Sequence, residues 1–326
     1  MPDSIARAMA AGGRLRGIAA ATTDTADDAR RRHGTYPVAS AALGRALTAA
    51  LLLGQTLKGD ERVSLQFNGD GPMREVFAEA DAGGRVRGYV RRPAVALPSK
   101  NGKLDVGGAL GRAGTLQVMR WSPGAAPYQG VVPLVSGEIA EDVASYLTTS
   151  DQIPSVVSLG VFVEVDGRVA AAGGFVVQRM PIDGAHAWNG DADAKLSLEE
   201  ERIISRVEAN LAPLPGASTL VGQGATPRSL IETVLAGLEP RVVAEGPVQF
   251  FCPCSPERVI RTLVTLGPDD LERLAREHGG TTATCHFCNT DYRFEAEDLR
   301  RLAVDLRAGR DPHPPGSAPA PNGAPL

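Results

Sequence analysis

Four cysteines are the residues of this sequence whose type and spacing best suit a chemical site. The chain has 326 residues, no cysteine before position 252, and then the phrases FCPC and TCHFC. The four are Cys252, Cys254, Cys285 and Cys288. Side chains two residues apart in an extended segment point to the same face, and a C-x-x-C turn is typical of a zinc knuckle. Four thiolates at about 2.3 Å make a closed tetrahedral Zn²⁺ site. We therefore expect one Zn²⁺ held by all four cysteines.

The cysteine spacing leaves several interpretations open. A purely structural zinc ribbon is the commonest one. A nucleic-acid-binding ribbon is disfavoured because residues 248–308 contain eight Arg, no Lys and ten acidic residues, and binding to phosphates needs clustered positive charge. A thioredoxin-like dithiol is disfavoured because CHFCNTDYRF leads into a strand-like run. His286 could replace one thiol, although a turn position is the simpler role for it, and His278 suits a helix end.

A redox switch is the remaining interpretation. Oxidants attack thiolates, and a unit of about 60 residues is near the size at which one core is marginal. Metal binding contributes roughly 10–16 kcal/mol to such units, and this is folding free energy. Oxidation would remove the ligands and with them that stabilisation. Four cysteines permit three disulfide pairings.

Helix signals between the two cysteine pairs bring the chain back to the metal. Ser255 is in capping position and Pro256 in the first helical position, which predicts a helix toward Leu266. The dipeptide at 267–268 ends it, and a second helical stretch is expected to run to His278.

The N-terminal part of the chain has the pattern of an α+β domain. Residues 37–57 are rich in Ala and Leu, which predicts a largely buried helix. From Arg62 onward, short β-rich runs separated by turn residues predict an antiparallel sheet with hairpins. Ser136 is the expected cap of a second helix, and two Val-rich strands meet at a turn formed by Asp166 and Gly167.

A helical connector is expected to follow this domain. Ser197 and Glu200 form a capping-box signature, a Gly/Pro-containing loop covers residues 212–226, and a second helix begins near Pro227. Isolated helices of this length are marginal in water, so both must pack on a neighbour. The predicted divisions are an α+β core domain at 1–190, a helical linker at 191–246, a zinc redox-switch domain with all four cysteines at 247–308 and a disordered Pro/Gly/Ala-rich tail at 309–326.

Composition limits the possible partners and location. The net charge is −4, with 43% hydrophobic and 22% charged residues, which is typical of a soluble globular protein. We expect no nucleic-acid partner, since no basic excess is present. No stretch approaches the ~18 uncharged apolar residues of a spanning helix, and no secretory signal is recognisable. A cytoplasmic protein with reduced thiols is the expectation.

Catalytic motifs are weak. The phrase VGQGATP lies between helices rather than after a strand, so a nucleotide-binding loop is not expected. Asp70 and Asp166 are better explained as turn formers. The sequence therefore predicts a non-enzymatic protein.

Several motifs in order resemble the 33-kDa chaperonin family, the redox-regulated heat-shock proteins of bacteria. They are RRRHGTYPVASAALGRALTAALLL, SLQFNGDGPM, GGRVRGYV, YQGVVPLVSGEIAEDVASYL, SDQIPSVVSLGVFV, GGFVVQRMP and the CPC and CHFC pairs with NTDYRF. They cover most of residues 5–190 and 247–305. Asp151 stands where the family usually has Glu, the connector matches least, and the tail is outside the pattern.

This resemblance implies an ATP-independent holdase chaperone that is inactive while reduced and zinc-bound. It implies that oxidation releases zinc and forms the disulfides Cys252–Cys254 and Cys285–Cys288. The zinc domain and connector would then unfold, expose apolar surface to unfolded or oxidatively damaged client proteins, and allow homodimerisation. The alternative is a non-chaperone zinc protein with a purely structural four-cysteine site, in which oxidation would only inactivate the protein.

Overall fold

A computed structural model describes residues 1–180 and 197–310 of the chain. These residues belong to two compact units, Met1–Phe251 and Cys252–Leu326. The predicted linker, from Ser197 onward, is part of the first unit. Apart from Gly309 and Arg310, the predicted tail lies outside the described residues.

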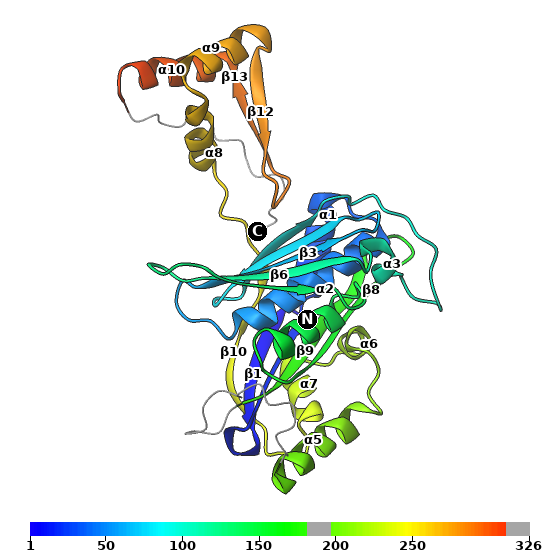
Figure 1. Cartoon of the computed structure of the whole chain (residues 1–326). Coiled ribbons are helices and arrows are strands. Elements are labelled where there is room, and N and C mark those ends of the chain that lie inside the picture. The colour runs from blue at the N-terminus through cyan, green and yellow to red at the C-terminus, as the bar shows by residue number, and fades with distance from the viewer. Residues whose placement is uncertain (181–196, 311–326) are drawn as a thin grey trace. The chain divides into compact units, whose positions relative to one another are not determined.

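The first unit contains two mainly antiparallel sheets (Figure 1). The five-stranded sheet has the order β10 (Arg241–Pro247), β1 (Ser4–Ala10), β2 (Leu15–Ala21), β9 (Val169–Arg179) and β8 (Ser155–Val163). The six-stranded sheet has the order β11 (Gln249–Phe250), β5 (Arg85–Val90), β4 (Glu75–Asp81), β3 (Arg62–Gly69), β6 (Gly114–Trp121) and β7 (Tyr128–Pro133). Among the strands of the described residues, only the short β11 pairs in parallel, with β5. The predicted α+β class with a mainly antiparallel sheet is confirmed.

Helix α2 (Pro37–Gly54) packs against strands of both sheets and is buried almost all round. Its Ala-rich sequence allows this, because small side chains let both sheets approach the helix closely. The predicted buried helix is confirmed, with its end at Gly54 instead of residue 57. By length and composition α2 could cross a membrane, although Arg45 interrupts the uncharged apolar run on which the prediction from the sequence depended. However, 89% of that stretch is buried inside the protein, so its apolarity serves the core.

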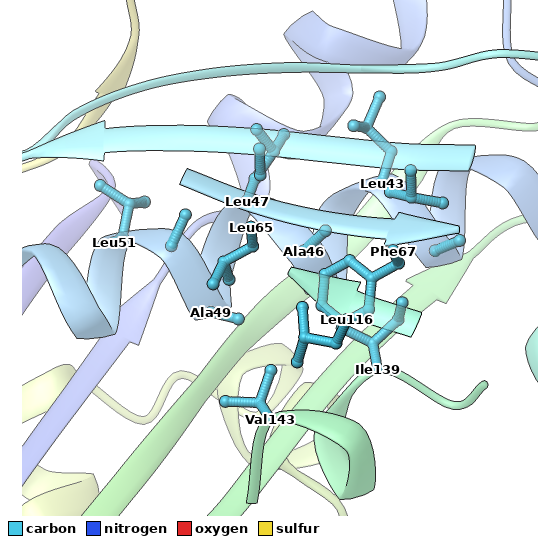
Figure 2. Packing of buried hydrophobic residues seen from close by; sticks show 14 of the residues in the cluster. Leu43, Ala46, Leu47, Ala49, Leu51, Leu65, Phe67, Leu116, Ile139 and Val143 are labelled. Atoms are coloured by element: carbon cyan, nitrogen blue, oxygen red, sulfur yellow. The ribbon is translucent and has the colours of Figure 1, made fainter. Parts of the chain in front are cut away.

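The main core forms where α2 meets the six-stranded sheet. Figure 2 shows Leu43 and Leu47 of α2 beside Leu65 and Phe67 of β3. Val143 of α4 (Ala140–Thr149) and Ile139, the residue before this helix, pack in the same cluster. Alternating burial along β3 places its apolar side chains on this face, as the period of a strand requires.

Helix α4 (Ala140–Thr149) begins differently from the prediction. The carboxylate of Asp142, not Ser136, holds its N-terminus: it accepts hydrogen bonds from the backbone N–H of Val135, Ser136, Gly137 and Ile139 at 2.8–3.3 Å. Ile139 is the N-cap residue, with a positive φ of 70°. The carboxylate thus ties the N–H groups of the preceding loop to the first turn of the helix, whereas the Ser136 hydroxyl accepts from the N–H of Glu138 within that loop.

The connector helices cover the other face of the five-stranded sheet. They are α5 (Leu198–Leu211), α6 (Ala217–Gly222) and α7 (Pro227–Val234), and α6 and α7 contact strands of this sheet (Figure 1). Ile203, Ile231 and Leu235 pack with Ala8 and Phe175 in a second apolar cluster. The capping box of α5 and the need for a packing neighbour are confirmed. Two details differ: α6 lies within the predicted loop, and the last part of the connector is strand β10.

The remaining elements complete the two units. In the first unit they are η1 (Ala11–Gly13), α1 (Thr23–His33) and α3 (Val106–Leu110); in the second they are α8 (Pro256–Leu263), η2 (Val264–Leu266), α9 (Pro268–Glu277), β12 (Gly280–Thr284), β13 (Asp291–Glu295) and α10 (Ala296–Arg307). The predicted turn at Asp166 and Gly167 joins β8 and β9. Ser255 caps α8 through the N–H of Arg258 at 3.4 Å, as predicted.

Candidate metal centre

The four cysteine sulfurs lie within 4.8 Å of one another. Sulfurs of different pairs lie 3.7 Å apart for Cys252 and Cys285 and 3.3 Å apart for Cys254 and Cys288. Two sulfurs of a tetrahedral Zn²⁺ site with 2.3 Å bonds are about 3.8 Å apart. The four sulfurs are therefore close enough together to bind one metal ion that, like Zn²⁺, has bonds of about 2.3 Å to sulfur. Within the described residues, His278 and His286 are exposed and do not belong to this group.

The local structure of the second unit positions both pairs. Cys252 and Cys254 precede α8, whose capping Ser255 and Pro256 start the helix directly after the second sulfur. Cys285 and Cys288 lie in the turn between β12 and β13. The N–H of Cys285 donates to Thr290 O and the N–H of Asn289 donates to Cys285 O, both at 2.8 Å. Asn289 has a φ of 57°, a left-handed conformation that Asn tolerates well, and it closes the knuckle.

The sulfur cluster is continuous with the small core of the second unit. Its buried members are Ile260, Leu263, Leu271, Ala275, Tyr292, Phe294, Leu299, Leu302 and Ala303. Cys254 and Cys285 pack against this core, and Cys288 is only 3% exposed. A metal ion held by the sulfurs would thus be joined to the apolar interior of the unit.

Two hydroxyl groups contact the sulfurs. Tyr292 donates a hydrogen bond to Cys254 Sγ at 3.1 Å. The Thr290 hydroxyl lies 3.3 Å from Cys288 Sγ, and it can donate to the sulfur once this thiol has lost its proton. Neither Tyr292 nor Thr290 was predicted from the sequence. The available signal was the alternation of β13, which places Tyr292 and Phe294 on the buried face.

The surroundings of the cysteines give their thiols different pKa values. Burial raises the pKa of Cys254 to about 11, although the bond from Tyr292 acts in the opposite direction. Hydrogen bonds from Cys252 and Cys285 lower the pKa of Cys288, so this thiol ionises most readily. The hydrogen bond with Cys252 raises the pKa of Cys285. Close thiols cannot all ionise together unless a cation compensates their charge.

Comparison with known proteins agrees with this arrangement. The family model described as "Hsp33 protein" matches residues 3–295. A "33 kDa chaperonin" of Geobacter sulfurreducens is 44% identical over 306 residues, covering 94% of this chain and 96% of the relative. A "33 kDa chaperonin" of Symbiobacterium thermophilum is 45% identical over 309 residues, covering 94% and 99%.

A solved structure gives the same result at the level of the fold. The 33-kDa chaperonin (heat shock protein 33 homolog) of Thermotoga maritima has a TM-score of 0.82 and 34% identity to this chain. The match covers 94% of this chain and all of the other. The resemblance inferred from the sequence motifs is therefore confirmed, and the chain belongs to the Hsp33 family, whose named members here are 33-kDa chaperonins.

Proposed function

We propose that this chain is a redox-regulated, ATP-independent holdase chaperone whose switch is the cysteine cluster. Membership of the Hsp33 family supports a chaperone role and the binding of client proteins. The observation that supports the switch is that every thiol of the chain lies in one cluster, with all sulfurs within 4.8 Å. An oxidant that reacts with thiols can therefore act only at this site.

The proposed ligands are Cys252, Cys254, Cys285 and Cys288, and the proposed cofactor is one Zn²⁺ in the reduced state. When bound, Zn²⁺ would hold four thiolates without redox chemistry of its own and contribute roughly 10–16 kcal/mol of folding free energy. The core of the second unit is small, so this contribution decides whether the unit is folded. In this state the protein would be inactive.

Oxidation by a peroxide is the proposed trigger. The two thiolates of one pair give two electrons to one peroxide molecule, whose O–O bond breaks. With two protons it leaves as two molecules of water, or water and an alcohol, and an S–S bond forms. The proposed disulfides are Cys252–Cys254 and Cys285–Cys288. All four cysteines are unbridged in this structure, so the two sulfurs of a pair must approach to about 2.05 Å for the bond to form.

Loss of the ligands would unfold the second unit and loosen the connector. The chain passes from β10 through β11 into Cys252 without an intervening linker. The connector helices cover Ala8 and Phe175 on the face of the five-stranded sheet. Their release would uncover an apolar surface for unfolded or oxidatively damaged proteins, and the active form would be a homodimer in the cytoplasm. In this scheme, the core domain comprises residues 1–190, the linker residues 191–246 and the zinc switch residues 247–308.

No catalytic step is part of this proposal. The family is named for a chaperone function, which is not enzymatic. The partners are client proteins, without nucleic acid or membrane.

The test is light scattering from a thermally unfolding client protein. Reduced, zinc-loaded protein is compared with the same protein after hydrogen peroxide at mildly elevated temperature, and zinc release is followed with a chromogenic chelator. We expect only the oxidised sample to suppress scattering, with zinc leaving as activity appears. If zinc leaves and scattering does not change, the cysteines form a structural site only.

The double variant Cys254→Ser with Cys285→Ser removes one sulfur from each proposed disulfide. It should lose zinc-controlled activation by peroxide, because neither local disulfide can form. Treatment of oxidised wild-type protein with a thiol reductant provides the matched control and should reverse its disulfides. An unchanged response of the double variant to peroxide would contradict the proposed switch.

A further inference from the structure

Tyr292 connects a cysteine sulfur to the core of the second unit. It lies on β13, where burial alternates, and only 6% of its surface is exposed. Its ring belongs to the same buried cluster as Phe294 and Leu299. Its hydroxyl donates to Cys254 Sγ at 3.1 Å. The side chain is thus fixed at one end by packing and bonded to the cluster at the other.

A hydrogen bond to a thiolate changes the chemistry of the sulfur. Outer partners orient metal ligands and tune their basicity, and hydrogen bonds to sulfur also shift the properties of iron–sulfur clusters. A sulfur lone pair that accepts a phenol proton is less available to attack the O–O bond of a peroxide. The same bond holds the Cys254 sulfur in the cluster, 3.3 Å from the sulfur of Cys288.

We propose that Tyr292 is a positioning residue that sets how fast the cysteine cluster responds to oxidant. Its phenol O–H lowers the reactivity of the Cys254 sulfur and holds this sulfur in place. The packing of its ring in the core fixes the position of the hydroxyl. This inference rests on the proposed function, since it assumes a metal-loaded cluster that reacts with peroxide. The inference adds a residue, Tyr292, that sets the peroxide concentration at which the cluster reacts.

Tyr292→Phe is the variant that isolates the hydroxyl, because the ring remains in the core. Full-length wild-type and variant proteins are loaded with Zn²⁺, and the release rate is measured with a chromogenic chelator across hydrogen peroxide concentrations well below the unfolding temperature. We expect release from Tyr292→Phe to be about three- to tenfold faster, corresponding to ~0.7–1.4 kcal/mol in the barrier at 1.4 kcal/mol per tenfold. A second measurement does not involve oxidation: in Co²⁺-loaded protein, the sulfur-to-metal charge-transfer band should shift to lower energy in the variant.

Phe294→Leu is the matched control. Phe294 lies two residues further on the same buried face of β13, is 3% exposed, and belongs to the same core. This change lowers stability and leaves the phenol bond to Cys254 in place. We expect its Co²⁺ spectrum to stay close to that of wild type, and its release rate to increase less than that of Tyr292→Phe.

The outcomes separate the inference from the proposed function. Equal release rates and spectra for Tyr292→Phe and wild type would overturn the role of the hydroxyl, and so would equal acceleration by Phe294→Leu, which would show that stability alone governs release. Both results leave the redox switch intact. A wild-type protein that binds no metal, or keeps it in peroxide, would instead overturn the proposed function.

Discussion

Metal affinity should depend on a core residue that carries no ligand atom. Leu271 on α9 is completely buried in the core of the second unit. Replacing such a Leu by Ala removes apolar contacts and leaves a cavity, which costs about 2–5 kcal/mol of folding free energy. If the metal-free second unit is unfolded, metal binding must supply the folding free energy. The full cost of Leu271→Ala then appears in the metal dissociation constant.

The expected effect is large. At 1.4 kcal/mol per tenfold change, 2–5 kcal/mol raises the Kd for Zn²⁺ by about 30- to 4,000-fold. The assay is competition with a chromophoric chelator in reduced full-length protein, together with far-ultraviolet circular dichroism of the metal-free form. The matched control is Val304→Ala on α10, where the side chain is 52% exposed. Exposed substitutions stay within about 0.5 kcal/mol, so its Kd should change by no more than about twofold.

One pair of results would refute this reasoning. If Leu271→Ala binds Zn²⁺ as tightly as wild type, and the metal-free protein keeps the helical signal of the second unit, that unit folds without metal. Binding and folding would then be independent, and loss of zinc could not unfold the switch.

Three further predictions concern other parts of the chain. Asp142→Asn replaces the oxygen that accepts from Ile139 by an amide nitrogen and removes the charge. Hydrogen bonds to charged groups contribute about 1.5–3 kcal/mol, so the urea midpoint for unfolding of the first unit should fall. An unchanged midpoint would contradict the capping role. In Gly160→Ala the new Cβ would lie 2.4 Å from the backbone N of Ser218, so α6 must move away from the sheet. Limited proteolysis should then cut the connector faster than in wild type. Equal cleavage rates would show that this contact is dispensable. Zn²⁺ affinity should fall as the pH is lowered, because burial raises the pKa of Cys254 to about 11 and Zn²⁺ binding must displace the thiol proton. A Kd for Zn²⁺ that does not change between pH 6 and 8 would mean that the thiols are already ionised.

Much of the architecture was predictable from local signals. Strand alternation, the buried helix of Ala and Leu, the capping boxes and the hairpin at Asp166 all depend on neighbours within a few residues, which a single sequence displays. The cysteine set was predictable for a similar reason, since few chemical roles suit two close pairs in an otherwise thiol-free chain. The sequence motifs then indicated the family that the comparisons confirm.

The predictions that failed depended on how a loop folds back on its own helix or on contacts between distant segments. Asp142 replaced Ser136 as the cap because the preceding loop folds back onto α4. Residues 241–247 became a strand because β1 offers an open edge more than 200 residues earlier in the chain.

By itself, the sequence determined most of the element types, the family and the four candidate ligands, because these follow from residue identity and short-range spacing. The tertiary structure decided that the four sulfurs gather within 4.8 Å, that the connector covers an apolar sheet face, and that Tyr292 reaches Cys254. Those facts require two chain segments to meet, and the hairpin of β12 and β13 with the small core beneath it fixes where they meet. Spacing along the chain limits which residues can reach a common centre, but only packing determines which of them touch.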